Sequence, residues 1–373
     1  MSAKLKDNQL NMSQRSAMTF TKAHKMKTRF VRWTALAIAF GVLTSAPALA
    51  DAQTKVRVGN LNTGSDVGLF IAETRGYFKA EGLDVELMSF PTAAKMIVPL
   101  ASGQLDVGGG SVSAGLYNAA ERGIGIRIVA DKGTSKPGHT FSALMVRNDL
   151  IASGRYKSFS DLKGMHIATA AFGTGNAATI NAALKKGGLK YSDADMVDLG
   201  FADHIAAFAN KRIDASMTSE PVATLIEKAG LAARVPGNDE IYPDHQTAVL
   251  LYAEEFAKTR PDIALKFMRG YLRGLRDYND VLQNGTLSGP GADKIIQIMI
   301  DNTNVKDPAL YRSIVSAALD PDGTVNVASL QSDLDFFSEQ GLVSPKVKAA
   351  NIVDMSFAKK AAADLGPYKR ATQ

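Results

Sequence analysis

The sequence predicts an α/β protein of two lobes, each lobe a sheet flanked by helices, with a ligand site between the lobes. The first observation is a repeat: "PLASGQLDVGGGS" at 99–111 and "AFANKRIDASMTS" at 207–219 share one spacing of small, apolar and acidic residues. The second is an order of strand, loop and helix that starts near Lys55 and restarts at His166. The third is a pair of extended apolar runs, one between the halves and one after the second half.

The first half reads as a β-α-β-α-β unit, since short apolar strands alternate with segments of helical periodicity. Glycines and small polar residues mark the turns. The expected elements are strand Val56–Gly59, loop Asn62–Ser65, helix Val67–Phe78, strand Val85–Met88, helix Ala93–Ser102, strand Leu105–Val107 and a helix opening at Ser111.

The second half repeats that order. Its expected elements are strand His166–Ala168, loop Gly173–Asn176, helix Ala177–Lys186, strand Met196–Leu199, helix Ile205–Asn210 and strand Ile213–Ala215. Right-handed crossovers then give each half a parallel sheet covered by helices. Asp106 and Asp214 stand at the N-terminal side of their strands, where we expect caps or turn formers rather than ligand contacts.

The two apolar runs, Phe141–Val146 and Thr247–Tyr252, are assigned to the crossings between lobes, because a chain that leaves one lobe and later returns must cross twice. The remainder is mostly helical. Amphipathic patterns over Ile263–Leu282, Ala292–Asp301 and Leu330–Gln340 predict helices that buttress the first lobe.

The N-terminal 50 residues are expected to be a leader. Within about 26–50, the basic segment Met26–Arg32 precedes the apolar run Trp33–Ala46, and Pro47–Ala50 has the small-x-small end of a signal-peptidase site. We expect cleavage between Ala50 and Asp51 and export, to the periplasm if the source has an outer membrane. The sequence contains no cysteine, which excludes disulfides, thiol catalysis and a lipoprotein anchor.

The basic charge belongs to that leader. Outside residues 1–50 there are 35 Lys and Arg against 36 Asp and Glu. There is therefore no charge argument for nucleic acid or an anionic membrane as a partner.

Enzyme motifs are weak or missing. Gly173–Ala178 satisfies G-x-G-x-x-A between a strand and a helix, which keeps an NAD-dependent oxidoreductase as the less favoured alternative. No G-x-S-x-G nucleophile elbow occurs, and the histidines outside the leader lack H-x-x-x-H spacing. We therefore predict no catalytic residue, no metal site and no cofactor.

Two residues carry open alternatives. His204 either reaches a ligand or is an exposed histidine at a helix start. Glu220, before Pro221, either complements a helix dipole or contacts a donor group on a ligand. His139, before the first crossing, is a weaker candidate for lining the cleft.

Several stretches resemble the substrate-binding proteins of ABC importers in the nitrate, sulfonate and taurine group, which also includes binders of thiamine precursors. The resemblance lies in "VRVGNLNTGSDVGLFIAETRGYFKAEGLDVEL", "LASGQLDVGGGSVSAGLYNAAERG", "ALMVRNDLIASGRYKSFSDLKG", "GFADHIAAFANKRIDASMTSEP" and "YLRGLRDYND". It implies a two-lobed periplasmic-binding-protein type II fold that closes by a hinge. Lobe 1 would comprise 51–145 and 246–373, and lobe 2 would comprise 146–245.

The resemblance also implies a monomeric receptor that hands a small molecule to an inner-membrane permease and its ATPase. Ser219 departs from many relatives, which have an aromatic residue before the Glu-Pro pair. The ligand-facing residues carried over are Asn62, Thr63, Pro91, Thr92, Ser111, Ser113, Thr174, Gly175, Asn176, Asp203, His204 and Glu220.

These loops offer hydroxyls, an amide and helix N-termini, but no arginine. They suit a small organic anion or zwitterion, such as a sulfonate, taurine or nitrate. A pyrimidine thiamine precursor or an aromatic carboxylate stays open as the alternative, as does signalling rather than transport.

Overall fold

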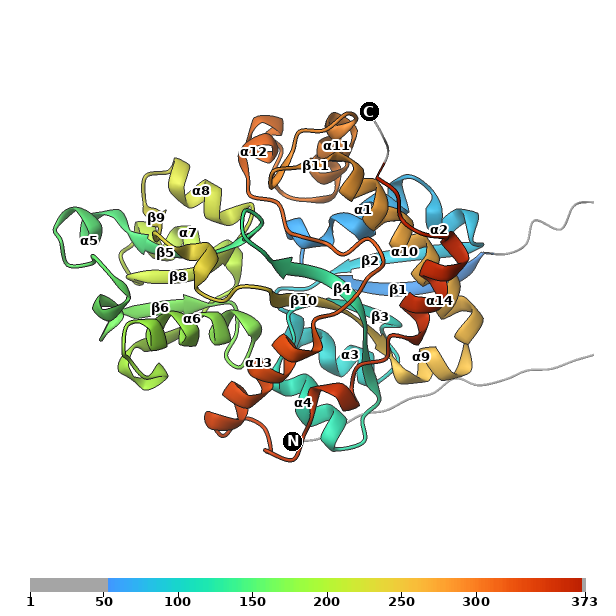
Figure 1. Cartoon of the computed structure of the whole chain (residues 1–373), viewed down its shortest axis with the longest axis horizontal. Helices are drawn as coiled ribbons and strands as arrows, with labels where there is room; N and C mark the ends of the chain where they lie inside the picture. Colours follow the sequence, from blue (N-terminus) through green and yellow to red (C-terminus); the bar gives the residue numbers. More distant parts are fainter. Residues whose placement is uncertain (1–52, 371–373) are drawn as a thin grey trace, which may run out of the picture. The chain divides into compact units, whose positions relative to one another are not determined.

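The computed structural model describes residues 53–370, so the predicted leader lies outside the described residues. Two five-stranded sheets organise this part of the chain, one on each side of the view in Figure 1. Within residues 53–370, no helix combines the length and the apolar character that a membrane span requires.

The first sheet has the strand order β2-β1-β3-β10-β4. Strands β1, β2 and β3 are parallel, whereas β10 runs antiparallel to both of its neighbours. Its strands are β1 Thr54–Asn60, β2 Leu83–Ser89, β3 Val107–Gly110, β4 Ile126–Ser135 and β10 His245–Ala253.

The second sheet has the matching order β7-β6-β8-β5-β9, and here β5 is the antiparallel strand. Its strands are β5 Ser142–Arg147, β6 His166–Thr169, β7 Asp195–Asp198, β8 Ala215–Ser219 and β9 Ala232–Arg234. The expectation of wholly parallel sheets was therefore wrong. Each crossing run enters the other lobe's sheet as its antiparallel fourth strand, and both crossing assignments are confirmed.

The repeat in the sequence corresponds to a repeated hydrogen-bond pattern. Asp106 precedes β3 and accepts from the backbone N–H of Arg57 at 2.9 Å, and Asp214 precedes β8 and accepts from that of His166 at 3.1 Å. Both carboxylates also pair with arginine side chains. Both carboxylates have a structural role, as expected, but they bond to a neighbouring strand rather than cap a helix or form a turn, and β3 and β8 each begin two residues later than predicted.

The helices follow the predicted order. Their bounds are α1 Val67–Thr74, α2 Tyr77–Ala80, α3 Ile97–Ala101, α4 Ala114–Glu121, α5 Asn148–Ala152, α6 Gly175–Lys186, α7 His204–Ala209, α8 Val222–Lys228, α9 Glu254–Thr259, α10 Pro261–Val281, α11 Ala292–Asn302, α12 Pro308–Ser313, α13 Val327–Glu339 and α14 Ser356–Leu365. A short hairpin, β11 Leu282–Gln283 with β12 Thr286–Leu287, follows α10.

The single helix predicted over Val67–Phe78 is divided, because Gly76 takes a left-handed conformation with φ of 71° between α1 and α2. The long helix α10 packs its apolar face against α1, α2 and α14, and Phe267 stacks on Phe78 with ring centroids 4.7 Å apart. Helix α10 therefore buttresses the first lobe as predicted (Figure 1).

Helix α13 contacts both lobes rather than the first alone. It packs against α4 and β10 of the first lobe and against α6 of the second. Buried His245 at the start of β10 joins them, since its Nε2 lies 2.9 Å from Asp333 on α13 and its Nδ1 lies 3.1 Å from Thr179 on α6.

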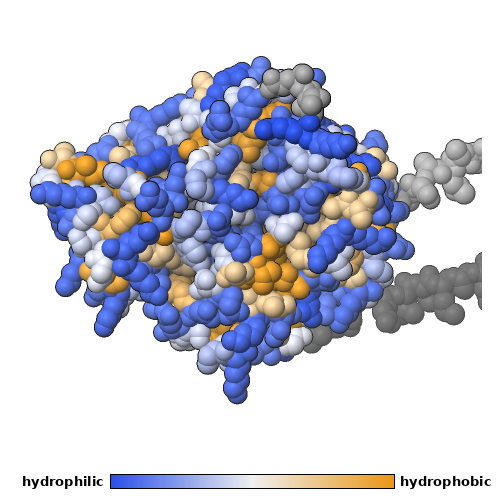
Figure 2. Space-filling model, viewed as in Figure 1, coloured by the Kyte–Doolittle hydropathy of each residue, from blue (hydrophilic) through white to orange (hydrophobic). Residues whose placement is uncertain are grey.

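The space-filling view shows hydrophilic side chains over most of one face, with apolar residues in scattered patches (Figure 2). The large hydrophobic residues that are exposed are Met88, Val98, Ile124, Ile151, Phe172 and Leu342. The apolar surface that decides the fold is thus inside the lobes.

Candidate functional site

A cavity of about 10 Å³ lies where loops of the two lobes meet the crossing strands. A cavity of that size holds about one water molecule. Its walls are Leu61, Thr63, Ser65, Gly110, Ser111, Phe141, Phe201, Ser219, Thr247 and Ala248. Five of these residues carry hydroxyls, two are phenylalanines and none is charged, while apolar atoms make up most of the surface that faces the cavity.

The cavity lies at the ends of strands where the fold leaves helix N-termini and turns. Thr63 and Ser65 follow β1, Ser111 follows β3, and Ser219 ends β8. In open sheets of this kind, ligands bind at the carboxyl ends of the parallel strands. The crossing residues Phe141 and Thr247 complete the cavity between the lobes.

The lobes are joined by hydrogen bonds on both sides of the cavity. On one side, the Gly64 N–H donates to the carbonyl of Glu220 at 3.3 Å. On the other, the Ala114 N–H donates to the carbonyl of Gly173 at 2.8 Å, beside a β-bridge between Ser113 and Thr174. The described conformation therefore has the lobes in direct contact around the cavity.

Of the twelve predicted site residues, Thr63 and Ser111 line the cavity directly. Asn176 lies immediately behind Ser111, whose hydroxyl donates to Asn176 Oδ1 at 3.3 Å. The Asn176 side chain is buried, and its Nδ2 has no hydrogen-bond partner among the residues that the structure describes. A buried donor without a partner is costly, so Asn176 is suited to a ligand acceptor.

Three predicted residues act as caps or turn formers near the cavity. Ser113 caps α4, accepting from the Leu116 N–H at 3.3 Å, and the Thr174 hydroxyl donates to the carbonyl of Ala171 at 2.8 Å. Gly175 begins α6 close to His245 and Asp333, which a Cβ would approach to within 3.4 Å.

Asn62, Pro91, Thr92 and Asp203 lie away from the cavity. Asn62 donates to Ser89 Oγ at 2.8 Å, which ties the loop after β1 to the end of β2. Pro91 and Asp203 are exposed. Thr92 and Asp203 precede helical turns at positions where neither side chain makes a capping hydrogen bond.

His204 is buried inside the second lobe rather than exposed at a helix start. Its Nδ1 lies 2.7 Å from Thr218 Oγ1 and its Nε2 lies 3.0 Å from the carbonyl of Leu199. Burial lowers its pKa from 6.5 to about 4. Both ring nitrogens are already used, so no polar atom of His204 is left for a ligand.

Glu220 is also engaged within the protein. Its carboxylate accepts from the Thr224 backbone N–H at 3.1 Å and from the Thr224 hydroxyl at 2.9 Å, and it pairs with Arg234 on β9. The Val315 N–H from the first lobe approaches the same carboxylate at 3.4 Å. Glu220 therefore helps to join the lobes, and its charge is compensated.

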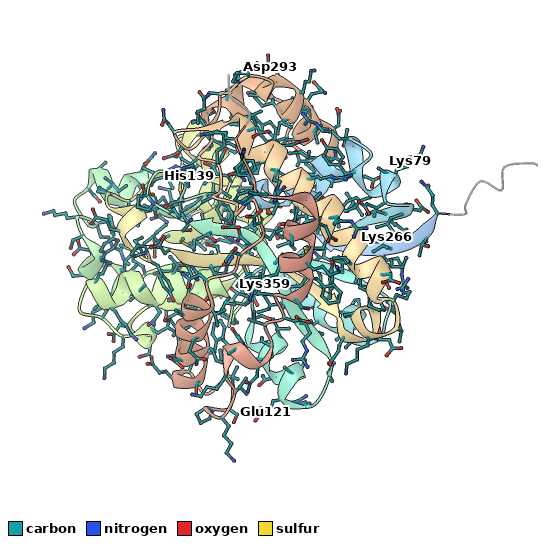
Figure 3. The ribbon with its side chains drawn as sticks, turned by 45° about the vertical axis from the view of Figure 1, so that its right-hand side comes forward. Lys79, Glu121, His139, Lys266, Asp293 and Lys359 are labelled. Atoms are coloured by element: carbon teal, nitrogen blue, oxygen red, sulfur yellow. The ribbon has the colours of Figure 1, made fainter. Side chains whose placement is uncertain are left out.

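Ser65, Ser219 and Thr247 line the cavity but were missed as site residues. Ser65 stood in the predicted turn and Ser219 in the repeat, so the position after a strand was the signal that pointed to them. His139, labelled in Figure 3, lies on the turn between β4 and β5 and lines a separate polar groove of about 620 Å³. It does not line the small cavity.

No group of three or more His, Asp or Glu residues that could hold a metal ion occurs within residues 53–370. The charged groups directly behind the lining residues are instead two ion pairs, Asp66 with Lys132 and Glu220 with Arg234. The cavity therefore offers hydroxyl groups and no unpaired charge.

Comparison with known proteins gives one family and several structural neighbours. A family model described as NMT1/THI5 like matches residues 65–280. A Brucella abortus protein, provisionally named a binding protein, is 26% identical over 264 residues, which cover 63% of this chain and 77% of the relative.

Among solved structures, the ligand-binding component of an ABC-type import system from Staphylococcus aureus aligns with a TM-score of 0.68 at 17% identity over 83% of this chain and 99% of its own. The alkanesulfonate-binding protein SsuA from Xanthomonas axonopodis, bound to MOPS, aligns with a TM-score of 0.63 at 18% identity. The alignment covers 81% of this chain and 98% of SsuA. The periplasmic nitrate-binding protein NrtA from Synechocystis aligns with a TM-score of 0.67 at 13% identity, over 84% of this chain and 89% of NrtA. A desulfurization enzyme, DszB, shares the fold with a TM-score of 0.54 at 14% identity, over 84% of this chain and 100% of DszB.

Proposed function

Since the chain belongs to the NMT1/THI5-like family, we propose that it is the solute-binding receptor of an ABC import system. It captures a small organic anion or zwitterion between its lobes and presents it to a membrane permease and its ATPase. The structural neighbours named as binding proteins, two of them for alkanesulfonate and nitrate, support this role and the periplasm as its place.

The observation that carries the proposal is the hydroxyl-lined cavity to which both lobes contribute. Thr63, Ser65 and Ser111 come from the first lobe, Ser219 comes from the second, and Thr247 comes from a crossing strand. A ligand larger than one water needs the lobes further apart than they are here. Hinge movement about the two crossings, as in other two-lobed receptors, supplies that space.

The proposed ligand contacts are Thr63, Ser65, Ser111, Asn176, Ser219 and Thr247. His204 and Glu220 are left out of this set, because their polar atoms are already bonded within the protein. The cavity itself offers no unpaired charge. Binding therefore rests on hydrogen bonds to a compact polar ligand rather than on an ion pair.

The glycine loop at the start of α6 argues against NAD. A Cβ on Gly173 would lie 3.0 Å from Ala114 Cβ and 3.1 Å from Leu342 Cδ1, both of the first lobe. In the described conformation, the space that a pyrophosphate needs at this helix N-terminus is thus filled by first-lobe atoms. The similarity to DszB is limited to the fold, and a shared fold does not imply a shared enzymatic activity.

The experiment is thermal unfolding of the purified protein against taurine, alkanesulfonates, nitrate, aromatic carboxylates, pyrimidines and NAD. A ligand at about 100 times its Kd stabilises the folded state by about 2.7 kcal/mol, which corresponds to several degrees in Tm. We expect a shift with one class of small organic compound. A shift with NAD alone, or with no compound of the panel, contradicts the proposal.

Ser111→Ala tests the place of binding. The variant removes a hydroxyl from the cavity, so the shift with the identified compound should shrink. The matched control is Ser102→Ala in the same lobe, where the exposed hydroxyl bonds only to the carbonyl of Pro99. Equal shifts in the two variants contradict binding in the cavity.

A further inference from the structure

Beneath the first-lobe wall of the cavity lies a fully buried ion pair. Lys132 on β4 and Asp66 have side chains with 0% exposure, and Lys132 Nζ lies 2.8 Å from Asp66 Oδ1. The same ammonium donates to Ser65 Oγ at 2.8 Å. An ammonium has protons but no lone pair, so Ser65 Oγ has to accept in this bond.

The other carboxylate oxygen sets the direction of the next bond. Asp66 Oδ2 accepts from the backbone N–H of Thr63 at 2.8 Å and from the Thr63 hydroxyl at 3.1 Å. A carboxylate facing an ammonium only accepts. The single hydroxyl proton of Thr63 is therefore directed at Asp66.

These two ends determine the bond between the hydroxyls. Ser65 Oγ and Thr63 Oγ1 are 3.0 Å apart, and geometry alone permits either to donate. Because the Thr63 proton is used on Asp66, Ser65 has to be the donor. The chain then runs in one direction, from Lys132 to Ser65, to Thr63, to Asp66, and it consumes both hydroxyl protons.

What remains toward the cavity is a pair of oxygen lone pairs. Thr63 and Ser65 both line the cavity, and within this chain neither has a proton left for a ligand. The wall accepts hydrogen bonds. A ligand with acceptors alone would have to break the bond from Ser65 to Thr63 before it received a proton.

The side facing the second lobe has the opposite character. The Nδ2 of Asn176 is a buried donor without a partner within residues 53–370, and Asn176 stands in the first turn of the 12-residue helix α6. Unpaired donors and the helix N-terminus both favour an acceptor there. The two sides of the site thus differ in hydrogen-bond polarity.

We propose that the ligand of this receptor carries an N–H donor group directed at Thr63 and Ser65 and an acceptor group directed at Asn176. The inference rests on the proposed function and narrows it, from any small organic anion or zwitterion to those bearing an amino or amide group. Simple alkanesulfonates and nitrate, which have acceptors only, bind more weakly. Lys132 is the positioning residue that orders the chain.

The glycines of the repeat make room for this arrangement. A Cβ at Gly109 on β3 would lie 2.7 Å from Lys132 Cε and 2.8 Å from Lys132 Cδ. The lysine stem therefore crosses β3 at Gly109, the middle one of three consecutive glycines. The buried lysine accounts for Gly109 in the run "GGGS", whereas Gly108 and Gly110 make room for Leu100 and Ala93.

The test is calorimetric titration of the full protein with matched pairs that differ by one amino group. The pairs are taurine with ethanesulfonate, 4-aminobenzoate with benzoate, and 4-aminopyrimidine with 4-methylpyrimidine. In the pair that the protein recognises, we expect the amino compound to bind at least about tenfold more tightly, the effect of one well-placed hydrogen bond.

Two variants locate the effect. Thr63→Val removes the hydroxyl acceptor, so the ratio of the Kd values of the two compounds should fall toward one. The conservative Thr63→Ser keeps a hydroxyl and should keep the ratio. Lys132→Gln removes the fixed direction, because an amide can donate or accept. Its loss of stability acts on both compounds alike and cancels in the ratio of their Kd values, so a reduced ratio reports the ordering role of Lys132.

Equal or tighter binding of the donor-free compound, or tight binding of nitrate, overturns the inference and leaves the proposed function standing. An amino preference that Thr63→Val retains also overturns it. Binding of no compound, either in these pairs or in the thermal panel, contradicts the proposed function itself.

Discussion

The two lobes compensate the carboxylates nearest the cavity with cations from their outer strands, but they bury these pairs to different depths. In the first lobe, Lys132 on β4 meets Asp66, and both side chains are 0% exposed. In the second lobe, Arg234 on β9 meets Glu220, and here the carboxylate is 1% exposed but the arginine is 21% exposed and shared with Glu227. One repeated topology thus holds a rigid half-site and a more solvated one.

The difference in burial predicts which of the two ion pairs contributes more to the stability of the folded protein. A buried ion pair is costly to break, since removing one partner leaves a charge in a medium that cannot solvate it. When one partner of an ion pair is partly exposed, water can solvate the remaining charge after that partner is removed. The first lobe should therefore respond strongly to changes that the second lobe tolerates.

The largest expected effect is that of Lys132→Met. It leaves Asp66 buried and uncompensated, so we expect a loss of about 3–5 kcal/mol in the free energy of unfolding, measured in urea. Arg234→Met is the matched change in the second lobe, and it should cost less because Arg234 is 21% exposed, so water can enter beside Glu220 when the guanidinium is removed. Equal losses would remove the distinction between the lobes.

Gly109→Ala disturbs the same pair without changing a charge. Its Cβ would overlap the middle of the Lys132 side chain, and overpacking of this kind costs about 1–3 kcal/mol. The control is Gly115→Ala in α4, where the nearest atom would lie 3.6 Å away and alanine favours the helix. The comparison fails if urea unfolding finds both variants as stable as the parent.

The lobes should also differ in the sign of their pH dependence. Burial lowers the pKa of His204 in the second lobe from 6.5 to about 4, so the unfolded chain binds this proton first. The contribution of neutral His204 is complete above pH 6.5 and is lost as the pH falls through 6.5 toward 4. Between pH 7 and pH 5 the loss is about 2 kcal/mol.

Asp131 on β4 of the first lobe acts in the opposite sense. Burial raises its pKa from 3.8 to about 6, so its contribution is complete below pH 3.8 and is lost as the pH rises toward 6. Urea unfolding at pH 7 and pH 5 should find His204→Gln less weakened by acid than the parent, and Asp131→Asn more weakened. Identical pH profiles for all three proteins would contradict both assignments.

The smallest expected effect compares two serines that line the cavity. Ser219→Ala removes a 2.6 Å bond to Ser142 and should cost about 1 kcal/mol. Ser65→Ala should cost more in the same urea assay, because the fully buried Lys132 ammonium loses a hydrogen-bond acceptor. A larger loss in the free energy of unfolding for Ser219→Ala than for Ser65→Ala would contradict the prediction that the first lobe is the more sensitive to substitution.

Much of the fold could be predicted from local pattern. The repeat, the order of strands and helices, and the two crossings were all readable because each depends on nearby residues. The antiparallel insertion of β5 and β10 was not, since it depends on which lobe receives each crossing strand. The break at Gly76 depends on packing of α2 that a helical periodicity does not reveal.

The site was harder to predict, because its residues meet from distant parts of the chain. Thr63 and Ser111 followed from their position after strands. The partners Lys132 and Arg234 did not, although "ADKG" within an apolar strand is a signal that a charged side chain is being buried for a reason. Neither alternative for His204, a ligand contact or an exposed helix start, included burial, because its partner Thr218 lies on strand β8, away in the sequence.

The most direct measurement of the account is hydrogen exchange of the protein with and without the compound that shifts its Tm. The account predicts slower exchange in loops of both lobes at once, around Thr63–Ser65, Ser111–Ser113, Thr174–Asn176 and Ser219, because one ligand is held between them. Protection confined to one lobe, or to the separate groove at His139, would contradict it.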